Sequence, residues 1–242
     1  MIKCTQLTKK YGNYSAVDNL NLEIKPGELF AFLGPNGAGK TTTIKMMTGI
    51  LKPTSGKVEI AGIDIQEKAG EAKMKIGYVP DTPYLYERLT AREFMEFIGG
   101  LYRLDPDIIR RRSYELFTLF DMNGWVDRKC EQYSHGMRQK LVFAAAMIHF
   151  PTVLIVDEPM VGLDPHSAKL VKDLLKDYVA KGNTVFVSTH ILSIAEELCD
   201  RVGIINKGRL IAVGSIGELK SAANKHDANL ESLFLSLTGQ PE

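Results

Sequence analysis

One short segment, residues 34–41, constrains the fold of this chain more than any other feature of its sequence. It has the sequence GPNGAGKT and follows the apolar run 29–33, and residues 39–50 contain no proline. Such an apolar run predicts a buried strand, and the stretch after it predicts a helix that ends in the turn residues of segment 51–56. The segment matches the pattern G-x-x-x-x-G-K-[ST], which predicts a loop whose backbone N–H groups surround phosphate oxygens.

The phosphate loop gives individual side chains expected tasks. Lys40 is expected to reach the outer phosphates, and the hydroxyl of Thr41 to ligate Mg²⁺, while the positive end of the helix dipole faces the same phosphates. The residues of this segment expected to contact a bound nucleotide are Asn36, Gly37, Ala38, Gly39, Lys40, Thr41 and Thr42. The alternative is a glycine-rich turn that binds nothing, and the flanking strand and helix argue against it.

A second apolar run supplies the acidic groups that such a loop needs. Residues 153–156 are followed directly by Asp157 and Glu158. Ligands of open parallel sheets bind beyond the carboxyl ends of the strands, so Asp157 is expected beside the loop, where its carboxylate suits the hard cation Mg²⁺. Glu158 is expected to polarise an attacking water. The alternative is that both carboxylates are only solvated residues of a turn at the end of the strand.

The order of the expected elements indicates an α/β fold. Expected strands alternate with helices on both sides of a purely helical region at residues 90–150. Because this alternation is typical of parallel sheets covered on both faces, we predict a P-loop NTPase core with a parallel sheet covered by helices, an N-terminal antiparallel β region and a helical insert subdomain. The expected strands are residues 2–7, 20–24, 29–33, 57–60, 152–156 and 184–187, and the later helices are residues 165–180 and 191–198.

Composition argues against several partners and locations. The 30 Lys and Arg against 29 Asp and Glu leave a net charge of +1, so no global field gathers nucleic acid, and no nucleic-acid partner is expected. Three cysteines far apart in the sequence predict neither a disulfide framework nor a metal cluster. The N-terminal residues do not resemble a signal peptide, and no apolar run approaches the roughly 20 residues that span a bilayer. A cytoplasmic protein is expected.

Three further motifs distinguish among proteins with phosphate loops. Residues 133–137 (YSHGM) precede the strand that ends at Asp157, and residues 162–165 (GLDP) and 188–190 (STH) follow it. In this order the motifs resemble those of the ATP-binding cassette (ABC) ATPase family, and the resemblance covers residues 2–216. It implies ATP and Mg²⁺ as ligands, and a dimer that binds two Mg-ATP between its subunits.

The resemblance implies how the base is held. Tyr11 is similar to the aromatic residue that stacks on adenine, and Val17 to its apolar neighbour. Stacking on an aromatic ring tolerates any base, so it gives little base specificity. A half-buried surface tyrosine is the alternative for Tyr11.

Four other positions match family motifs that act at the γ-phosphate or across the dimer. Ser134 and Gly136 resemble the signature residues that touch the γ-phosphate held by the opposite subunit, and Asp164 resembles the residue that communicates across the dimer. His190 resembles the histidine that senses the γ-phosphate and positions the attacking water, so the catalytic set is Glu158, His190 and Lys40. Helix N-caps are the alternatives for Ser134 and Asp164, and a structural histidine is the alternative for His190.

The chain departs from the family pattern at three positions. His135 and Met137 stand where the signature usually has Gly and Gln, and Asp81 follows residues 77–80 (GYVP), where the family has Gln. A carboxylate at this place is expected to ligate Mg²⁺, which gives the metal set Thr41, Asp81 and Asp157. The alternative is that Asp81 only faces a membrane partner.

The resemblance also implies partners and a division of the chain. A lone cassette resembles the detachable subunit of bacterial export-type transporters, with a transmembrane permease as a separate chain and a second ABC subunit, identical or paralogous. It is expected at the inner face of the cell membrane. Residues 1–220 are expected to form the ABC ATPase domain, with its insert at about 88–147. Residues 221–242 are expected to form a tail with a short amphipathic helix that has Leu230, Leu233, Phe234 and Leu237 on one face.

Two other kinds of P-loop protein remain as alternatives to a transporter subunit. Residues 224–227 (NKHD) match the N-K-x-D motif of GTPases, but they lie in a polar stretch instead of ending a buried strand. A small-molecule kinase would lack Ser134, Gly136 and His190 in their family positions. An ABC ATPase without a transport role is the remaining possibility within the family itself.

Overall fold

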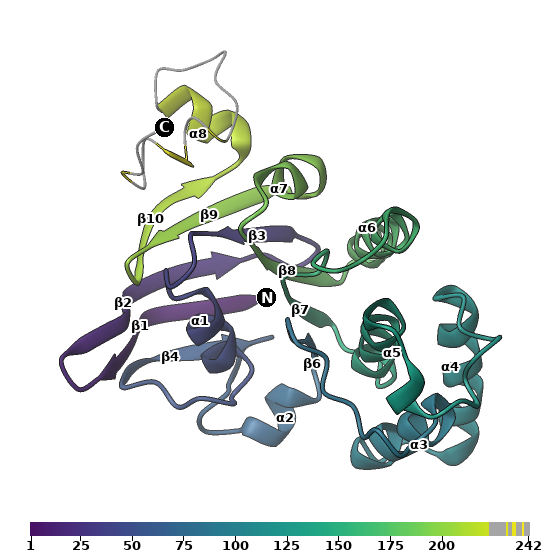
Figure 1. The fold of residues 1–242 in the computed structure, drawn as a ribbon. Helices are drawn as coiled ribbons and strands as arrows, with labels where there is room; N and C mark the ends of the chain where they lie inside the picture. Colours follow the sequence, from purple (N-terminus) through teal and green to yellow (C-terminus); the bar gives the residue numbers. More distant parts are fainter. Residues whose placement is uncertain (223–230, 232–233, 236–238, 240–242) are drawn as a thin grey trace.

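The chain, described here from a computed structural model, has two β-sheets and a set of helices (Figure 1). The structure describes residues 1–222, 231, 234–235 and 239. The smaller sheet contains β1 (Ile2–Tyr11), β2 (Tyr14–Ile24), β4 (Ser55–Ile60) and β5 (Ile63–Asp64). Its strand order is β2-β1-β4-β5, and all of these pairs are antiparallel.

The larger sheet carries the phosphate loop. Its strands are β3 (Leu29–Leu33), β6 (Ile76–Val79), β7 (Val153–Asp157), β8 (Thr184–Thr189), β9 (Arg201–Asn206) and β10 (Arg209–Gly214). They lie in the order β10-β9-β3-β8-β7-β6, and β10 alone pairs antiparallel, at one edge. The predicted α/β fold, with a parallel sheet and an N-terminal antiparallel region, is confirmed.

The helices occupy two positions relative to the sheets. They are α1 (Lys40–Met47), α2 (Ala69–Lys73), α3 (Ala91–Leu101), α4 (Pro106–Leu119), α5 (His135–Met147), α6 (Pro165–Ala180), α7 (Leu192–Leu198) and α8 (Ile216–Ala222), with a 3₁₀ turn at Cys130–Gln132. Helix α1 lies between the two sheets, whereas α5, α6 and α7 pack on the opposite face of the larger sheet.

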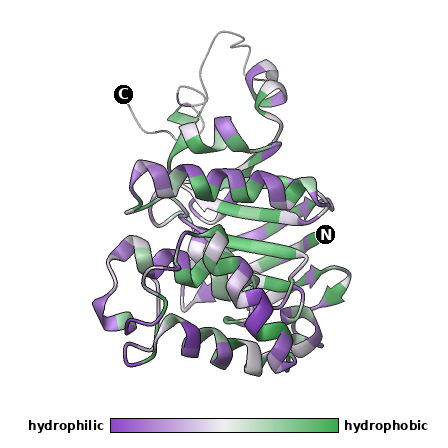
Figure 2. Cartoon of the chain, turned by 90° about the vertical axis from the view of Figure 1, so that its right-hand side faces the viewer, coloured by the Kyte–Doolittle hydropathy of each residue, from purple (hydrophilic) through white to green (hydrophobic). Residues whose placement is uncertain are grey.

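Side chains along the central strands point alternately to the two faces of the larger sheet, and this divides the core between the two layers. On β3, Phe30 and Phe32 pack toward α1 and the smaller sheet, where Ile44 and Val58 are also fully buried. The residues between them face the other layer, because side chains of a strand alternate in direction. Figure 2 shows the central strands as mostly hydrophobic and the outer helices as mixed, as expected for a sheet covered on both faces.

The expected helical insert consists of α3 and α4, followed by α5, which leads back to the larger sheet (Figure 1). Gly99 of α3 lets α4 approach closely, because a Cβ there would lie 2.6 Å from Ile109. Of the tail, Phe234 is described and is buried in a cluster with Leu219. The rest of the expected apolar face (Leu230, Leu233 and Leu237) and the N-K-x-D segment at 224–227 lie outside the described residues.

Candidate nucleotide-binding site

The phosphate loop connects β3 to α1, as its sequence predicts. Gly39 is the N-cap of α1 with φ 109°, and a Cβ there would lie 2.5 Å from the carbonyl oxygen of Ala16. A Cβ on Gly34 would lie 2.5 Å from the carbonyl oxygen of Ile205. Both contacts are with backbone atoms, which cannot move aside, so only glycine fits at either position.

Lys40 lies at the centre of the loop and is 7% exposed. Its Nζ donates hydrogen bonds to the carbonyl oxygens of Gly34 at 2.6 Å and Pro35 at 3.3 Å, and lies 3.8 Å from Oε1 of Glu158. Burial lowers the pKa of Lys40, and the negative charges of Glu158 and Asp157 oppose that effect. The loop therefore holds its ammonium group between carbonyl oxygens and the two acidic residues at the end of β7.

Asp157 ends β7 and is 1% exposed. Its Oδ2 accepts a hydrogen bond from Oγ1 of Thr41 at 3.2 Å, and its Oδ1 accepts one from the hydroxyl of Ser188 on the neighbouring β8. Burial raises the pKa of Asp157; the two hydrogen bonds oppose that shift, and the negative charges of Asp81 and Glu158 add to it. A cation that binds here would relieve this repulsion, and the oxygen-only donors suit Mg²⁺.

Glu158 follows the strand with φ 50°, a left-handed conformation that is uncommon outside glycine and asparagine. Its backbone N–H donates to the carbonyl oxygen of Ser188 at 3.0 Å. Its Oε1 lies 2.9 Å from Nδ1 of His190, while Oε2 is buried with no hydrogen-bond partner in the described part of the chain. A carboxylate oxygen that is buried beside the loop and unpaired is suited to accept a proton from a water molecule.

These groups line one cleft of about 310 Å³ next to the β1–β2 hairpin. Ten of the expected contact residues line it: Tyr11, Asn36, Gly37, Gly39, Lys40, Thr41, Thr42, Asp81, Asp157 and Glu158. Three others were not anticipated: Tyr14, Ala16 and Pro35. Tyr14 and Ala16 belong to β2, and the sequence signal that could have found them is their closeness to Tyr11 across a short turn.

Among the residues expected at the chain's own nucleotide, Val17, Ala38 and His190 do not line the cleft, although His190 contacts Glu158 there. Val17 is fully buried in the core between the sheets, because neighbours on a strand point to opposite faces and Ala16 takes the cleft side. Ala38 is 2% exposed; its N–H donates to the carbonyl oxygen of Pro35 at 3.1 Å, and its own carbonyl accepts from the N–H of Gly208 at 2.9 Å. Ala16 therefore faces the cleft and Val17 the core, and a contact of Val17 with the base stays a prediction.

Ser134 and Asp164 are not part of this cleft and cap helices, as their structural alternatives predicted. Ser134 accepts a hydrogen bond from the backbone N–H of Met137 at the start of α5. Asp164 accepts from the backbone N–H groups of His166 and Ser167, and hydrogen bonds from the side chain and backbone of Ser167 lower the pKa of Asp164 to about 2. A capping role leaves both side chains on the surface, where a second molecule can reach them.

The signature segment contacts the loop that contains Asp164. A Cβ on Gly162 (φ 73°) would lie 2.6 Å from the imidazole of His135, so the histidine that departs from the family pattern packs against this loop. Gly136 is half-buried and has open space beside it. The signature segment and the loop that contains Asp164 thus lie in contact, and Ser134, Gly136 and Asp164 do not line the nucleotide cleft of their own chain.

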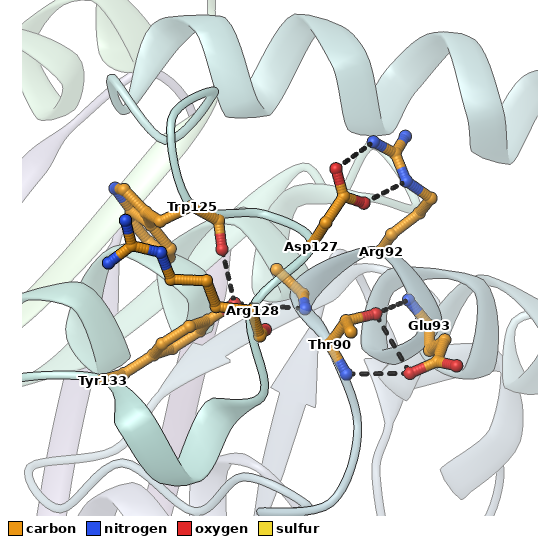
Figure 3. A network of polar contacts seen from close by, with 8 residues as sticks. Thr90, Arg92, Glu93, Trp125, Asp127, Arg128 and Tyr133 are labelled. Carbon is orange, nitrogen blue, oxygen red and sulfur yellow. Dashed lines mark hydrogen bonds and ion pairs between the residues drawn. The ribbon is translucent and has the colours of Figure 1, made fainter.

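A polar network positions the signature relative to the helical insert (Figure 3). The hydroxyl of Tyr133 accepts from the backbone N–H of Ala91 at 3.2 Å and donates to the carbonyl oxygen of Arg128 at 2.9 Å. Thr90 and Glu93 form a capping box at the start of the same helix, α3. Because Tyr133 directly precedes Ser134, these hydrogen bonds connect the signature to the start of α3.

Comparison with known proteins identifies the family. The family model for ABC transporters matches residues 17–161. The chain belongs to the ABC transporter family. As an ABC cassette it has the nucleotide-binding fold of an ATP hydrolase, and in the described residues no helix is long and apolar enough to cross a membrane.

Two relatives show how far the similarity in sequence extends. The chain is 37% identical to the probable multidrug ABC transporter ATP-binding protein YbhF of Escherichia coli over 98% of its own length and 41% of that protein. It is 38% identical to the linearmycin resistance ATP-binding protein LnrL of Bacillus subtilis, over 91% of its length and 71% of that protein. It thus spans less than half of the first relative.

A solved ATP-binding subunit of an ABC transporter matches the chain with a TM-score of 0.93 at 30% identity, covering 98% of this chain and 99% of that one. An ATP-binding cassette solved as a dimer in a post-hydrolysis state with ADP and Pi matches with a TM-score of 0.82 at 29% identity, covering 89% and 99%. The ABC cassette fold is therefore shared over nearly the whole chain.

Proposed function

We propose that this chain is the nucleotide-binding subunit of an ABC exporter, which hydrolyses ATP as a dimer to move a separate transmembrane partner. The observation that carries the proposal is the cleft in which the phosphate loop, the Thr41–Asp157 pair and Glu158 meet. Beside the loop, the largely buried carboxylate of Glu158 contacts the exposed His190, and a glycine-rich turn that binds nothing does not require such a pair.

At the cleft, the chain's own residues divide the work of phosphoryl transfer. The N–H groups of the loop and Lys40 neutralise charge that develops on the phosphates. Thr41 and Asp157 would hold Mg²⁺, which supplies further charge neutralisation when it is bound, and Asp81 lines the same wall. Glu158 accepts a proton from the attacking water, while His190, 2.9 Å from its carboxylate, orients that group.

The positions of Ser134 and Gly136 support a dimer. Both lie at the start of α5, outside the cleft of their own chain, so a second chain must bring its copies to the phosphates. The related cassette that was solved as a dimer with ADP and Pi is consistent with this arrangement. The second subunit is an identical chain or a paralogue, with ATP between the two.

A groove of about 910 Å³ between α2, α3 and α5 supports a membrane partner. Its wall includes the apolar side chains Phe94, Ile98 and Val142 and the exposed Tyr84. Pro80 lines this groove and the next residue, Asp81, lines the nucleotide cleft, so one turn of chain connects the two sites. A short apolar helix from the permease fits this groove, and it holds the subunit at the inner face of the membrane.

Export is the direction that the relatives favour. The names of two of them state multidrug transport and linearmycin resistance. We infer that this chain serves a similar exporter.

The test of the proposal is a mixing experiment with two inactive variants. Lys40→Ala removes the cation of the phosphate loop. Ser134→Asp retains a residue that caps helices well but places a negative charge toward the partner's phosphates. Phosphate release from ATP and GTP is measured for each variant alone and for equal mixtures, with a search for any phosphorylated acceptor.

Each variant alone should be inactive. Half of the dimers that form at random from an equal mixture are mixed, and each mixed dimer has one intact composite site, so about a quarter of wild-type activity should return. An inactive mixture would contradict a homodimer with shared sites. Strong preference for GTP would favour a GTPase, and a phosphorylated acceptor would favour a kinase.

A further inference from the structure

We propose that Tyr14 forms, together with Tyr11, an aromatic platform on which the base of a bound purine nucleoside triphosphate stacks. The proposal rests on the proposed ATP-binding function and adds to that site a residue that no motif of the sequence contains. It makes Tyr14 a determinant of nucleotide affinity.

The β1–β2 hairpin fixes the direction of both rings. Tyr11 is the last residue of β1 and Tyr14 the first of β2, and the two are paired directly across a two-residue turn in which Gly12 has φ 57°. Residues paired directly in antiparallel strands point to the same face, with Cβ atoms about 5 Å apart. Both rings therefore leave the hairpin on one face, whatever their rotamers.

That face is the one that borders the nucleotide cleft. Ala16, two residues after Tyr14 on the same strand, lines the cleft as well, whereas Val17 is fully buried on the opposite face. The alternation along β2 thus agrees with the cross-strand pairing. Tyr11, Tyr14 and Ala16 form one continuous side of the cleft, facing the phosphate loop.

The surroundings of Tyr11 leave part of its surface unavailable. Nζ of Lys9 lies 5.2 Å from the centroid of the Tyr11 ring and donates to the carbonyl oxygen of Lys52 at 2.8 Å. This ammonium group covers one face of the ring, so a base has to use the other face. The Tyr14 ring enlarges the aromatic surface that remains for a base.

Both rings are largely exposed, Tyr11 at 53% and Tyr14 at 60%. A bound base would cover this aromatic surface. Stacking depends on the π-face that every base has, so ATP and GTP should gain alike from the platform. A ligand that has phosphates but no base should gain nothing.

The test compares calorimetric affinities for ATP, GTP and inorganic tripolyphosphate, each with Mg²⁺. The variants are Tyr14→Ala, Tyr14→Phe and, as a matched control, Tyr114→Ala, since Tyr114 on α4 is 69% exposed and does not line the cleft. Tyr14→Ala should bind ATP and GTP at least about 5-fold more weakly, the lower end of the effect of one aromatic–base stack. Tyr14→Phe should retain wild-type affinity, because the ring persists.

Each outcome has a definite meaning. Unchanged ATP affinity in Tyr14→Ala would overturn the platform, and so would an equal loss of tripolyphosphate binding, which would show a distorted phosphate loop instead. An equal effect of Tyr114→Ala would also overturn it. Failure of the wild-type chain to bind ATP at all would count against the proposed function itself, and so the two failures are distinguishable.

Discussion

His149, in the connection between α5 and β7, should make the fold sensitive to mild acid. Its ring stacks on Tyr102 at the end of α3, with ring centroids 3.6 Å apart and planes within 3°. Its Nε2 lies 2.9 Å from the carbonyl oxygen of Ile76 on β6, and its Nδ1 is buried with no partner in the described chain. The neutral form, with Nε2–H as donor, satisfies this environment.

The size of this effect of pH on stability follows from the shift in the pKa of His149. Burial lowers the pKa of His149 from 6.5 to about 4, although the hydrogen bond to Ile76 opposes that shift. The folded state therefore binds this proton less readily than the unfolded state. The resulting stability is fully present above pH 6.5 and is lost as the pH falls toward 4, and it amounts to about 3 kcal/mol.

The assay is urea unfolding between pH 7.5 and pH 4.5 for the wild type and His149→Gln. An amide can still donate to the carbonyl of Ile76 but does not titrate. The variant should have a smaller free energy of unfolding than the wild type at pH 7.5, because it loses the stack on Tyr102. Between pH 7.5 and pH 4.5, however, its free energy of unfolding should fall by about 2 kcal/mol less than that of the wild type. His166→Gln, at an exposed histidine, is the matched control and should behave as wild type. Identical pH dependence in the wild type and His149→Gln would refute the reasoning.

Three further predictions concern the cleft. Lys40→Ala should abolish tight ATP binding, measured by calorimetry, because it removes the side-chain cation of the loop; retained submicromolar affinity would contradict this. Asp81→Gln should raise the Mg²⁺ concentration needed for half-maximal ATPase activity, and superimposable Mg²⁺ titrations would end the metal-contact hypothesis. Gly39→Ala should lower stability by at least about 1 kcal/mol and weaken ATP binding, because its φ is 109° and the Cβ would meet the carbonyl oxygen of Ala16. A Cβ on Gly100 would meet open space, so Gly100→Ala is the control and should keep wild-type stability and ATP affinity.

The parts of the site that local sequence determines could be predicted. The loop before α1 and the acidic pair after β7 depend on a strand that leads directly into them, and the structure places both where the motifs indicated. The N-caps at Ser134 and Asp164 are equally local. Their residue types favour a cap at the start of a helix in any fold.

Contacts that depend on pairing between distant strands could not be predicted. The sequence indicated a strand only at residues 20–24, whereas β2 begins at Tyr14. The side of this strand that faces the cleft depends on its register with β1, which has irregularities along its length. A single residue of shift exchanges the faces, so the sequence alone could not show that Ala16 faces the cleft and Val17 the core. The contact of His190 with Glu158 similarly arises because β7 and β8 are neighbours.

The most direct test of the account is the behaviour of Glu158→Gln. The amide cannot accept the proton of the attacking water, but it keeps the shape of the side chain and the phosphate loop intact. With ATP and Mg²⁺ the variant should bind nucleotide as the wild type does, release no phosphate, and elute from gel filtration as a dimer that returns to monomer when ATP is removed. Wild-type turnover by Glu158→Gln, or an ATP-bound variant that stays monomeric, would contradict the assignment of Glu158 as the base or the ATP-bridged dimer.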